Sequence, residues 1–245
     1  MDMTGKVVLV TGGGSGMGRL ACQLMSRRGA RVLALDVNEQ GLAETAAGDA
    51  GIVTRLLDVT DFAAVDAALR EAEATLGPVH RVYNAAAIMP LGKLLEQDNA
   101  TVHRIMAINY GGLVNIAQAA LPAMIRRGAG EFVSFSSLAG WIPMLRVGAY
   151  NASKFAVSAF TEVLYHENRA SGLRFACVCP PPVATPVGAP VQLNFTITAS
   201  KKKAKAKVAI AIHTPDNLTS GTDSSAPTAA ATSAPATAPT STEVS

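Results

Sequence analysis

Tyr150 and Lys154 are the two side chains whose types and spacing carry the clearest chemical meaning. They stand four residues apart in the run YNASK, so a helix that begins near residue 150 places the phenol and the ammonium on one face, one turn apart. Tyrosine is a poor base because its ordinary pKa is near ~10, and a neighbouring cation lowers that value by roughly 1–3 units. The pair therefore predicts that Lys154 makes Tyr150 a usable proton carrier.

Ser137 and Asn109 are two polar residues that the same chemistry can use. Ser137 directly follows the apolar run 131–136, and a hydroxyl at the carboxyl end of a strand can hold a substrate oxygen while Tyr150 moves the proton. Asn109 lies in an otherwise apolar helical stretch, where a buried amide needs partners. We expect it to bridge through water to Lys154, with a capping or surface role as the alternative.

The glycine-rich run TGGGSGMG occupies residues 11–18, between an apolar run and a helical pattern. Glycines let a backbone turn sharply and approach a pyrophosphate, whose charge then faces the free N–H groups of a helix N-terminus. Asp36 ends the next apolar run, where a carboxylate can accept hydrogen bonds from ribose hydroxyls and repel a 2′-phosphate. Val37, not a basic residue, follows it. The pattern therefore predicts a dinucleotide site that favours NAD over NADP.

Short apolar runs alternate with helical patterns along most of the chain. We predict strands at 6–10, 31–36, 52–57, 81–84, 131–136 and 174–179, and helices at 16–28, 61–76, 101–126 and 150–170. Such alternation predicts an α/β fold with right-handed crossovers, in which one doubly wound parallel sheet of Rossmann type is covered by helices on both faces. Ligand is then expected at the carboxyl ends of the strands.

Length and composition fit a single α/β domain, because 245 residues with 49 % apolar and 16 % charged content can bury a large core. The net charge of the chain is +3, and five lysines between residues 201 and 207 contribute +5 of it, so the rest of the chain has a net charge of −2. The folded part therefore has no electrostatic support for nucleic-acid binding. The three cysteines show neither disulfide nor metal spacing. Without a long apolar run, we expect a cytoplasmic protein that has no membrane segment and no metal.

The sequence changes character near residue 187. Residues 215–245 consist mostly of Ser, Thr, Ala and Pro and are predicted to form a disordered, low-complexity tail. In the intervening extension, 188–214, the runs 191–198 and 207–214 alternate apolar with polar or small residues around the lysines. They predict either a hairpin or an unstructured extension. The folded domain is expected to span 1–187.

Together these motifs resemble the short-chain dehydrogenase/reductase family, from about residue 4 to residue 187. TGGGSGMG corresponds to the family's TGxxxGxG, residues 83–87 (YNAAA) correspond to its NNAG, and Ser137, Tyr150 and Lys154 have the family's spacing. The resemblance implies an oxidoreductase that interconverts a secondary alcohol and a ketone with NAD(H). Tyr150 is then the general acid/base, Ser137 orients the substrate, Lys154 also binds the nicotinamide ribose, and Asn109 completes a proton relay.

The resemblance also implies which residues contact the cofactor and the substrate. The cofactor-binding residues are then Gly12, Ser15, Gly16, Met17, Gly18, Asp36, Asp58, Val59, Asn84, Ala85, Tyr150, Lys154, Val183 and Thr185. Met89, Trp141 and Met144 are expected to line a pocket for a small apolar alcohol or ketone, ordinary packing being the alternative. In this family the helices corresponding to 101–126 and 150–170 form a homodimer interface, with core packing as the competing account, and a tetramer is in doubt.

Three departures from the family pattern bear on function. Ala86 stands where the family usually has glycine, and the proline–glycine pair after the sixth strand is replaced by three prolines, 180–182. No substrate-covering helix or seventh strand is recognisable after residue 187. Two functional hypotheses therefore stay open: an active NAD-dependent oxidoreductase, or a catalytically silent NAD-binding module with an association or regulatory role.

Overall fold

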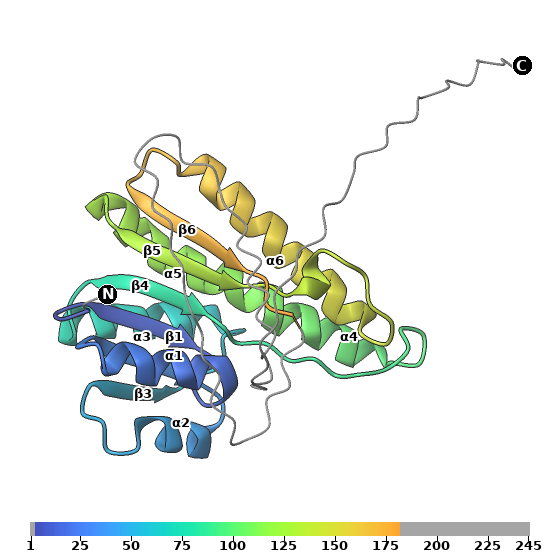
Figure 1. Ribbon diagram of the computed structural model, residues 1–245, viewed down its shortest axis with the longest axis horizontal. Coiled ribbons are helices and arrows are strands. Elements are labelled where there is room, and N and C mark those ends of the chain that lie inside the picture. Colours follow the sequence, from blue (N-terminus) through green and yellow to red (C-terminus); the bar gives the residue numbers. More distant parts are fainter. Residues whose placement is uncertain (1–2, 182–245) are drawn as a thin grey trace, which may run out of the picture. The chain divides into compact units, whose positions relative to one another are not determined.

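Six parallel strands form the sheet on which the candidate site is built, in the order β3-β2-β1-β4-β5-β6 (Figure 1). The computed structural model describes residues 3–181. The strands are β1 Val7–Thr11, β2 Arg31–Asp36, β3 Ile52–Leu56, β4 Val79–Asn84, β5 Gly130–Phe135 and β6 Leu173–Val178. The order reverses between β1 and β4, as the predicted Rossmann arrangement requires.

The helices connect these strands in the predicted alternation. They are α1 Gly16–Ser26, α2 Glu39–Ala46, α3 Phe62–Thr75, α4 Asn99–Met106, α5 Gly112–Arg127 and α6 Gly148–Glu167. Every predicted strand and helix is present, within two residues at most boundaries. Helix α2 was not predicted, because it has only eight residues and its main local signal is the Asn38 cap, whose side chain accepts a hydrogen bond from the Gly41 N–H. The predicted extension and tail lie outside the described residues.

Both faces of the central strands are buried, which explains their continuous apolar sequences. Along β1, Val7 and Leu9 belong to a core formed with α3, α5 and α6, whereas Val8 and Val10 belong to a second core formed with α1 and α2. All four of these side chains are at most 1 % exposed. The sheet therefore separates two helical layers (Figure 1), and only the strand ends are free to carry polar chemistry.

The long helix predicted at 101–126 is divided by a π-helical turn at Ala107–Gly111, between α4 and α5. A π turn inserts one residue into the α-helical repeat and is often found at functional sites. Asn109 stands in the middle of this turn and is 3 % exposed. The turn thus explains how an amide enters an otherwise apolar helix face.

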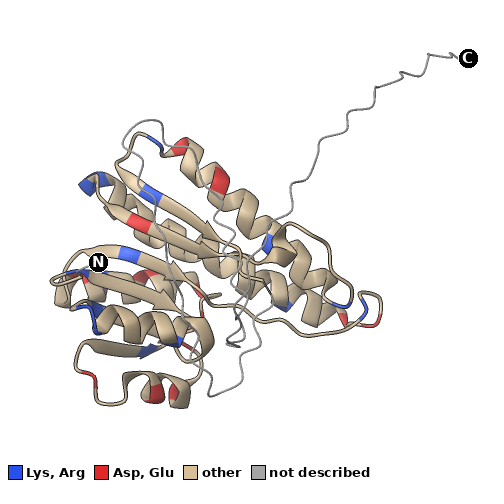
Figure 2. Cartoon of the chain, in the orientation of Figure 1, with Lys and Arg blue, Asp and Glu red and all other residues tan. Residues whose placement is uncertain are grey.

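An ion triad links the three strands on one side of the sheet, with two of its members buried and the third, Arg174, exposed. Glu131 of β5 forms ion pairs with Arg81 of β4 and Arg174 of β6, and it stands opposite each of them in the strand register. Figure 2 shows basic and acidic segments on neighbouring strands of the sheet. A slip of one residue would bury charge without a partner, which is costly. The triad therefore fixes the register of β4, β5 and β6, and with it the place of their carboxyl ends.

Candidate active site

The loop after β1 meets the loop after β4 at the point where the strand order reverses. Gly12 has φ +68°, and a Cβ there would lie 2.9 Å from the Ala86 nitrogen and 3.0 Å from the Ala85 carbonyl carbon. Both the conformation and the close approach exclude a side chain. The first predicted glycine thus occupies the switch point where ligands bind in open α/β sheets.

The N-terminus of α1 offers unpaired donors at this place. Ser15 is the N-cap residue in extended conformation, but its side chain makes no capping hydrogen bond. The first N–H groups of a helix have no intrahelical acceptor, and they favour an anion. Gly18 lies so close to the Gly12 carbonyl that a Cβ would clash with it. Ser15, Gly16, Met17 and Gly18 therefore form a turn that fits a pyrophosphate.

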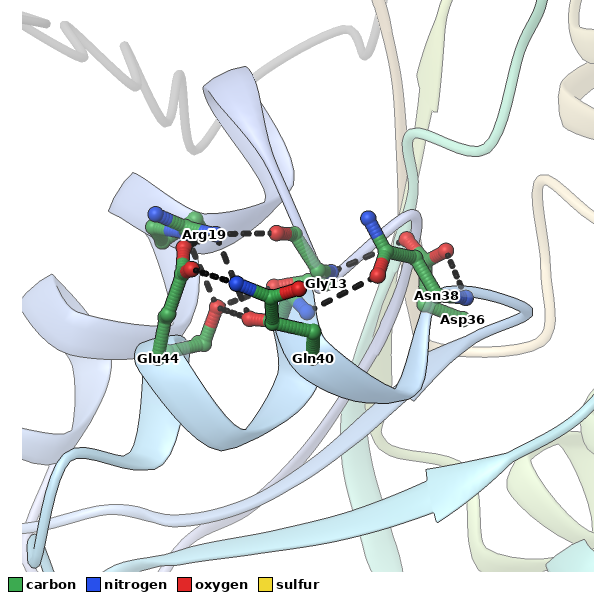
Figure 3. Close-up of polar contacts among 9 residues, drawn as sticks. Gly13, Arg19, Asp36, Asn38, Gln40 and Glu44 are labelled. Atoms are coloured by element: carbon green, nitrogen blue, oxygen red, sulfur yellow. Dashed lines mark hydrogen bonds and ion pairs between the residues drawn. The ribbon is translucent and has the colours of Figure 1, made fainter. Parts of the chain in front are cut away.

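Asp36 lies at the end of β2, against the glycine loop. Its Oδ2 accepts a hydrogen bond from the Gly14 N–H at 2.9 Å, and its Oδ1 accepts one from the Asn38 N–H at 2.9 Å (Figure 3). Each carboxylate oxygen can accept a second bond, so capacity for ribose hydroxyls remains. The neighbouring Val37 is 66 % exposed and uncharged.

Arg19 is a structural partner of the glycine loop that sequence reasoning missed. Its guanidinium donates to the Gly14 carbonyl at 2.5 Å, to Thr45 Oγ1 at 3.1 Å and to Glu44 Oε2 at 2.8 Å (Figure 3). Thr45 Oγ1 in turn donates to the Gly13 carbonyl at 2.8 Å. Helix α2 is thereby fastened to the loop. The available signal was a basic residue directly after the glycine run.

The remaining predicted cofactor residues lie at the ends of β3 and β4. Asp58 accepts hydrogen bonds from the N–H and the hydroxyl of Thr60 at 2.9 and 2.8 Å, and the Val59 carbonyl accepts one from Asn115. Asn84 is buried and its Oδ1 accepts from the Thr11 hydroxyl at 2.8 Å.

The Asn84 amide nitrogen is a group here whose hydrogen-bonding capacity is unmet. Within residues 3–181 it is buried without an acceptor, a situation that costs about 1–3 kcal/mol unless a ligand or water pairs with it. It stands on the strand whose following loop contacts Gly12, which fits a polar ligand at this edge. Val183 and Thr185 lie outside the described residues.

Ser137 and Tyr150 are brought together where β5 ends and α6 begins. Ser137 caps a short 3-10 turn, Leu138–Gly140, and its Oγ accepts a hydrogen bond from the Ala139 N–H at 3.1 Å. The Ser137 hydroxyl interacts with the Tyr150 phenol and lowers the phenol's pKa. Burial raises that pKa by more, so it lies above its ordinary value of 10.0. The phenol is therefore protonated at neutral pH.

Lys154 is buried beneath this pair, at 3 % exposure. Its ammonium donates to the Phe135 carbonyl at 2.7 Å and lies 5.5 Å from the centroid of the Tyr150 ring. Burial lowers the pKa of Lys154 from 10.5 to about 8, against a smaller opposing effect of Cys177 and Cys179. The predicted geometry of one helical turn is present.

The predicted effect of Lys154 on the tyrosine is nevertheless wrong for this structure. The ammonium is committed to a backbone carbonyl and faces the ring, and burial governs the pKa of Tyr150. Desolvation disfavours the charged form of both groups, so it raises one pKa and lowers the other.

Asn109 connects the loop after β4 to α6. Its Oδ1 accepts from the Ile88 N–H at 2.8 Å, and its Nδ2 donates to the Ile88 carbonyl and to Ser153 Oγ, both at 3.0 Å. Ser153 Oγ donates to the Tyr150 carbonyl at 2.7 Å. Both amide hydrogens are thus used within the protein, and a water bridge to Lys154 stays a prediction. Ser153, which sequence reasoning missed, lies within the YNASK run.

The three residues expected to line the substrate pocket lie on the loops that follow β4 and β5. Met89, Trp141 and Met144 are 53 %, 46 % and 36 % exposed. The Gly92 N–H donates to the Arg146 carbonyl at 2.9 Å, which joins the two loops, and Asn151 of α6 donates to the Met144 carbonyl at 3.1 Å. The two loops therefore present apolar side chains, and hydrogen bonds to their backbone carbonyls hold them in place.

Two negative findings apply to residues 3–181. No group of three His, Cys, Asp or Glu side chains among them could hold a metal ion. None of their helices is both long and apolar enough to cross a membrane.

We expect the burial of Lys154 to appear as a pH dependence of stability. Below pH 8 its amine is protonated in both the folded and the unfolded state, and the cost of burying the charge is present in full. Between pH 8 and 10.5 the unfolded state binds more protons, so the free energy of unfolding rises with pH, by roughly 3 kcal/mol in total.

Urea unfolding at both ends of this range, under reducing conditions, measures the rise in the wild type and in Lys154→Met, which should lack it. Lys93→Met is the matched control, because Lys93 is exposed and pairs only with Glu96 at the surface. An equal rise in all three proteins would contradict the assignment.

Comparison with known proteins agrees with this geometry. The family model described as short chain dehydrogenase matches residues 6–194. A Mycobacterium tuberculosis protein that carries the provisional name oxidoreductase SadH is 38 % identical over 189 residues, which cover 75 % of this chain and 68 % of the relative. The 2-(S)-hydroxypropyl-CoM dehydrogenase 3 of Xanthobacter autotrophicus is 36 % identical, with 71 % and 70 % covered.

Two further similarities agree with these. The 2-keto-3-deoxy-L-fuconate dehydrogenase of Xanthomonas campestris is 33 % identical, with 78 % of this chain and 63 % of the relative covered. The crystal structure of levodione reductase superposes with a TM-score of 0.70 at 27 % identity, covering 73 % of this chain and 72 % of that structure. With its glycine loop, its Ser137–Tyr150–Lys154 arrangement and its sheet order, this chain belongs to the short-chain dehydrogenase/reductase family of Rossmann-fold oxidoreductases.

Proposed function

We propose that this chain is an NAD(H)-dependent oxidoreductase that interconverts a secondary alcohol and a ketone, with Tyr150 as the general acid/base. The observation that carries the proposal is the buried Lys154 ammonium, which is held by the Phe135 carbonyl at the end of β5 and lies 5.5 Å from the centroid of the Tyr150 ring, with Ser137 following the same strand end. The names of the relatives, which are dehydrogenases and a reductase of hydroxy and keto compounds, support the same reaction type.

The residues at the switch point fit NAD. The N-terminus of α1 and the Ser15 hydroxyl would hold the pyrophosphate, the spare accepting capacity of Asp36 would hold the adenosine ribose, and the Asn84 amide nitrogen is a buried donor that needs an acceptor. When bound, the nicotinamide supplies or accepts the hydride. The side chains of this protein bind and orient the substrate and move the proton.

The proton chemistry follows from the two hydroxyls. Ser137 Oγ accepts the Ala139 N–H, so its own proton can be donated to the Tyr150 oxygen or to a substrate oxygen. Tyr150 is protonated at neutral pH because burial raises its pKa, so it is poised to donate a proton to the oxygen of a ketone as that oxygen becomes an alkoxide. Alcohol oxidation needs the phenolate, and higher pH favours it.

The exposed apolar side chains on the two loops support an apolar substrate. Trp141 and Met89 are about half exposed, and Ile142 beside Trp141 is 55 % exposed. The catalytically silent module remains the second candidate, because the segment after residue 181 lies outside the described residues. Free thiols at all three cysteines support a cytoplasmic location.

We predict that NADH binds at least about tenfold more tightly than NADPH, which corresponds to about 1.4 kcal/mol of repulsion between the Asp36 carboxylate and a 2′-phosphate. Fluorescence titration of the wild type and of Asp36→Asn measures this ratio. The variant keeps an oxygen acceptor but loses the charge, so its ratio should approach one.

Asp49→Asn is the control, because Asp49 also accepts a backbone N–H, that of Gly51, on a turn at the start of β3. Its ratio should equal that of the wild type. Equal affinity of the wild type for the two cofactors would overturn the NAD assignment.

For catalysis we predict that Tyr150→Phe lowers turnover about 10²- to 10⁴-fold while NADH affinity is preserved, because the proton carrier is lost and the ring is kept. The assay is ketone reduction over a panel of cyclic and aromatic ketones, followed by NADH absorbance. Tyr165→Phe on the same helix should keep wild-type turnover. Full turnover in Tyr150→Phe would refute the mechanism, and NADH binding without turnover on any ketone would favour the silent module.

We also propose a homodimer through the outer face of α6. Ala152, Phe155, Ala159 and Val163 form an exposed stripe of apolar and small residues at helical spacing, with Phe155 42 % and Val163 52 % exposed. Contiguous exposed apolar residues of this kind mark interaction surfaces.

Light scattering after size exclusion should accordingly give the mass of a dimer, and Phe155→Glu should shift the protein toward monomer. Leu95→Glu, at an apolar residue that is 99 % exposed on the loop before α4, should leave the dimer intact. A monomeric wild type would contradict the proposal.

A further inference from the structure

Cys177 and Cys179 place two thiols in contact at the end of β6. Their Sγ atoms are 3.9 Å apart. Cys177 lies in the register that directs Leu173 and Phe175 toward the core formed with α6. Residues two apart on a strand have Cα atoms roughly 6.6 Å apart at ~3.3 Å per residue, within the upper part of the range that a disulfide can span.

The surroundings of the pair favour one thiolate. The indole N–H of Trp141 donates to Cys179 Sγ at 3.1 Å, and the Lys154 ammonium attracts negative charge on both sulfurs. Hydrogen bonding within the pair lowers the pKa of Cys179 to about 6 and raises that of Cys177. A thiolate beside a protonated thiol is the starting arrangement for forming a disulfide.

Cys22 provides the contrast within the same chain. It is fully buried on the inner face of α1 and has neither of these partners. Burial raises its pKa to about 12, so it should be inert toward oxidants. Cys179 is only 2 % exposed, whereas Cys177 is partly buried, so a small oxidant must reach the Cys179 sulfur past Cys177.

We propose that Cys177 and Cys179 are an oxidation site, which a hydroperoxide converts into an intramolecular disulfide. The Cys179 sulfur attacks the peroxide O–O bond, becomes a sulfenic acid and releases hydroxide, or an alkoxide from an organic peroxide. Cys177 then attacks the sulfenic sulfur, the S–S bond forms, and hydroxide leaves. The proton from Cys177 and one from solvent neutralise the leaving groups, so two sulfurs are oxidised by two electrons and the O–O bond is reduced.

The consequence is a change in the loop that carries Trp141. The disulfide removes the thiolate that accepts the indole N–H and withdraws a negative charge from near Lys154. Leu138, in the same loop, is bound to this strand end by its N–H, which donates to the Pro180 carbonyl at 2.9 Å. The oxidation chemistry stands independently of the proposed alcohol–ketone activity.

The test uses the full chain, reduced and then freed of reductant. Hydrogen peroxide is added at increasing concentration, the protein is then unfolded in denaturant, free thiols are blocked with N-ethylmaleimide, and peptides are analysed by mass spectrometry. We expect the number of alkylated cysteines to fall from three to one, Cys22, and the peptide with Cys177 and Cys179 to be lighter by two hydrogens until dithiothreitol restores it. Fluorescence of Trp141, the single tryptophan of the chain, should change with the same peroxide dependence.

Cys177→Ser and Cys179→Ser are matched variants that each remove one partner. Neither should form the light peptide. Cys177→Ser keeps the attacking sulfur and should stop at a sulfenic acid on Cys179, whereas Cys179→Ser should show no peroxide-dependent change in fluorescence. The wild-type thiol count decides the matter even if a variant does not fold. The proposal would be overturned if Cys177 and Cys179 can still be alkylated at a peroxide concentration that already oxidises Cys22. Recovery of the two cysteines as sulfinic acids, or as disulfides between two chains, would also overturn it.

Discussion

The buried ammonium of Lys154 is the interaction on which the candidate site depends. Its Nζ donates to the Phe135 carbonyl at the end of β5, and its own carbonyl accepts a hydrogen bond from Ser136 Oγ at 2.9 Å. Both ends of one residue thus fasten α6 to the same strand end. Gly140 completes the contact, because a Cβ there would lie 2.7 Å from the Lys154 carbonyl oxygen. The relative positions of Ser137 and Tyr150 follow from this attachment.

A buried cation is costly, and the fold bears that cost at a place where the charge is useful. The carbonyl of Phe135, the face of the Tyr150 ring and the sulfurs of Cys177 and Cys179 all lie where they reduce it. The Lys154 ammonium therefore lies next to both the tyrosine and the two cysteines. Its effect on the tyrosine is positional, since burial sets the phenol's pKa, whereas its effect on the sulfurs is electrostatic.

The sequence predicted the architecture well because strand burial on both faces and helix periodicity leave direct marks on residue order. The TGGGSGMG run and the YNASK spacing likewise predicted which strand ends carry polar groups. Helix α2 escaped prediction because eight residues give little periodicity. The spacing of residues in the sequence does not show how deeply a side chain is buried. Tyr150 and Lys154 are one turn apart as expected, yet desolvation raises the tyrosine pKa, which was predicted to fall. The contacts of Arg19 with Glu44 and of Cys179 with Trp141 join residues 25 and 38 positions apart, so residue order alone does not specify these partners.

The two ends of the strands have different roles, and the division explains how the site can be polar without weakening the sheet. The triad of Arg81, Glu131 and Arg174 lies near the amino ends of β4, β5 and β6, where paired charges set the register. At the carboxyl ends the corresponding polar groups are left with capacity to spare: the Asn84 amide lacks an acceptor among the described residues, and Ser137 retains a proton. Because the register is fixed at one end, the other end can keep unsatisfied donors in place, and it is those donors that a ligand can pair with.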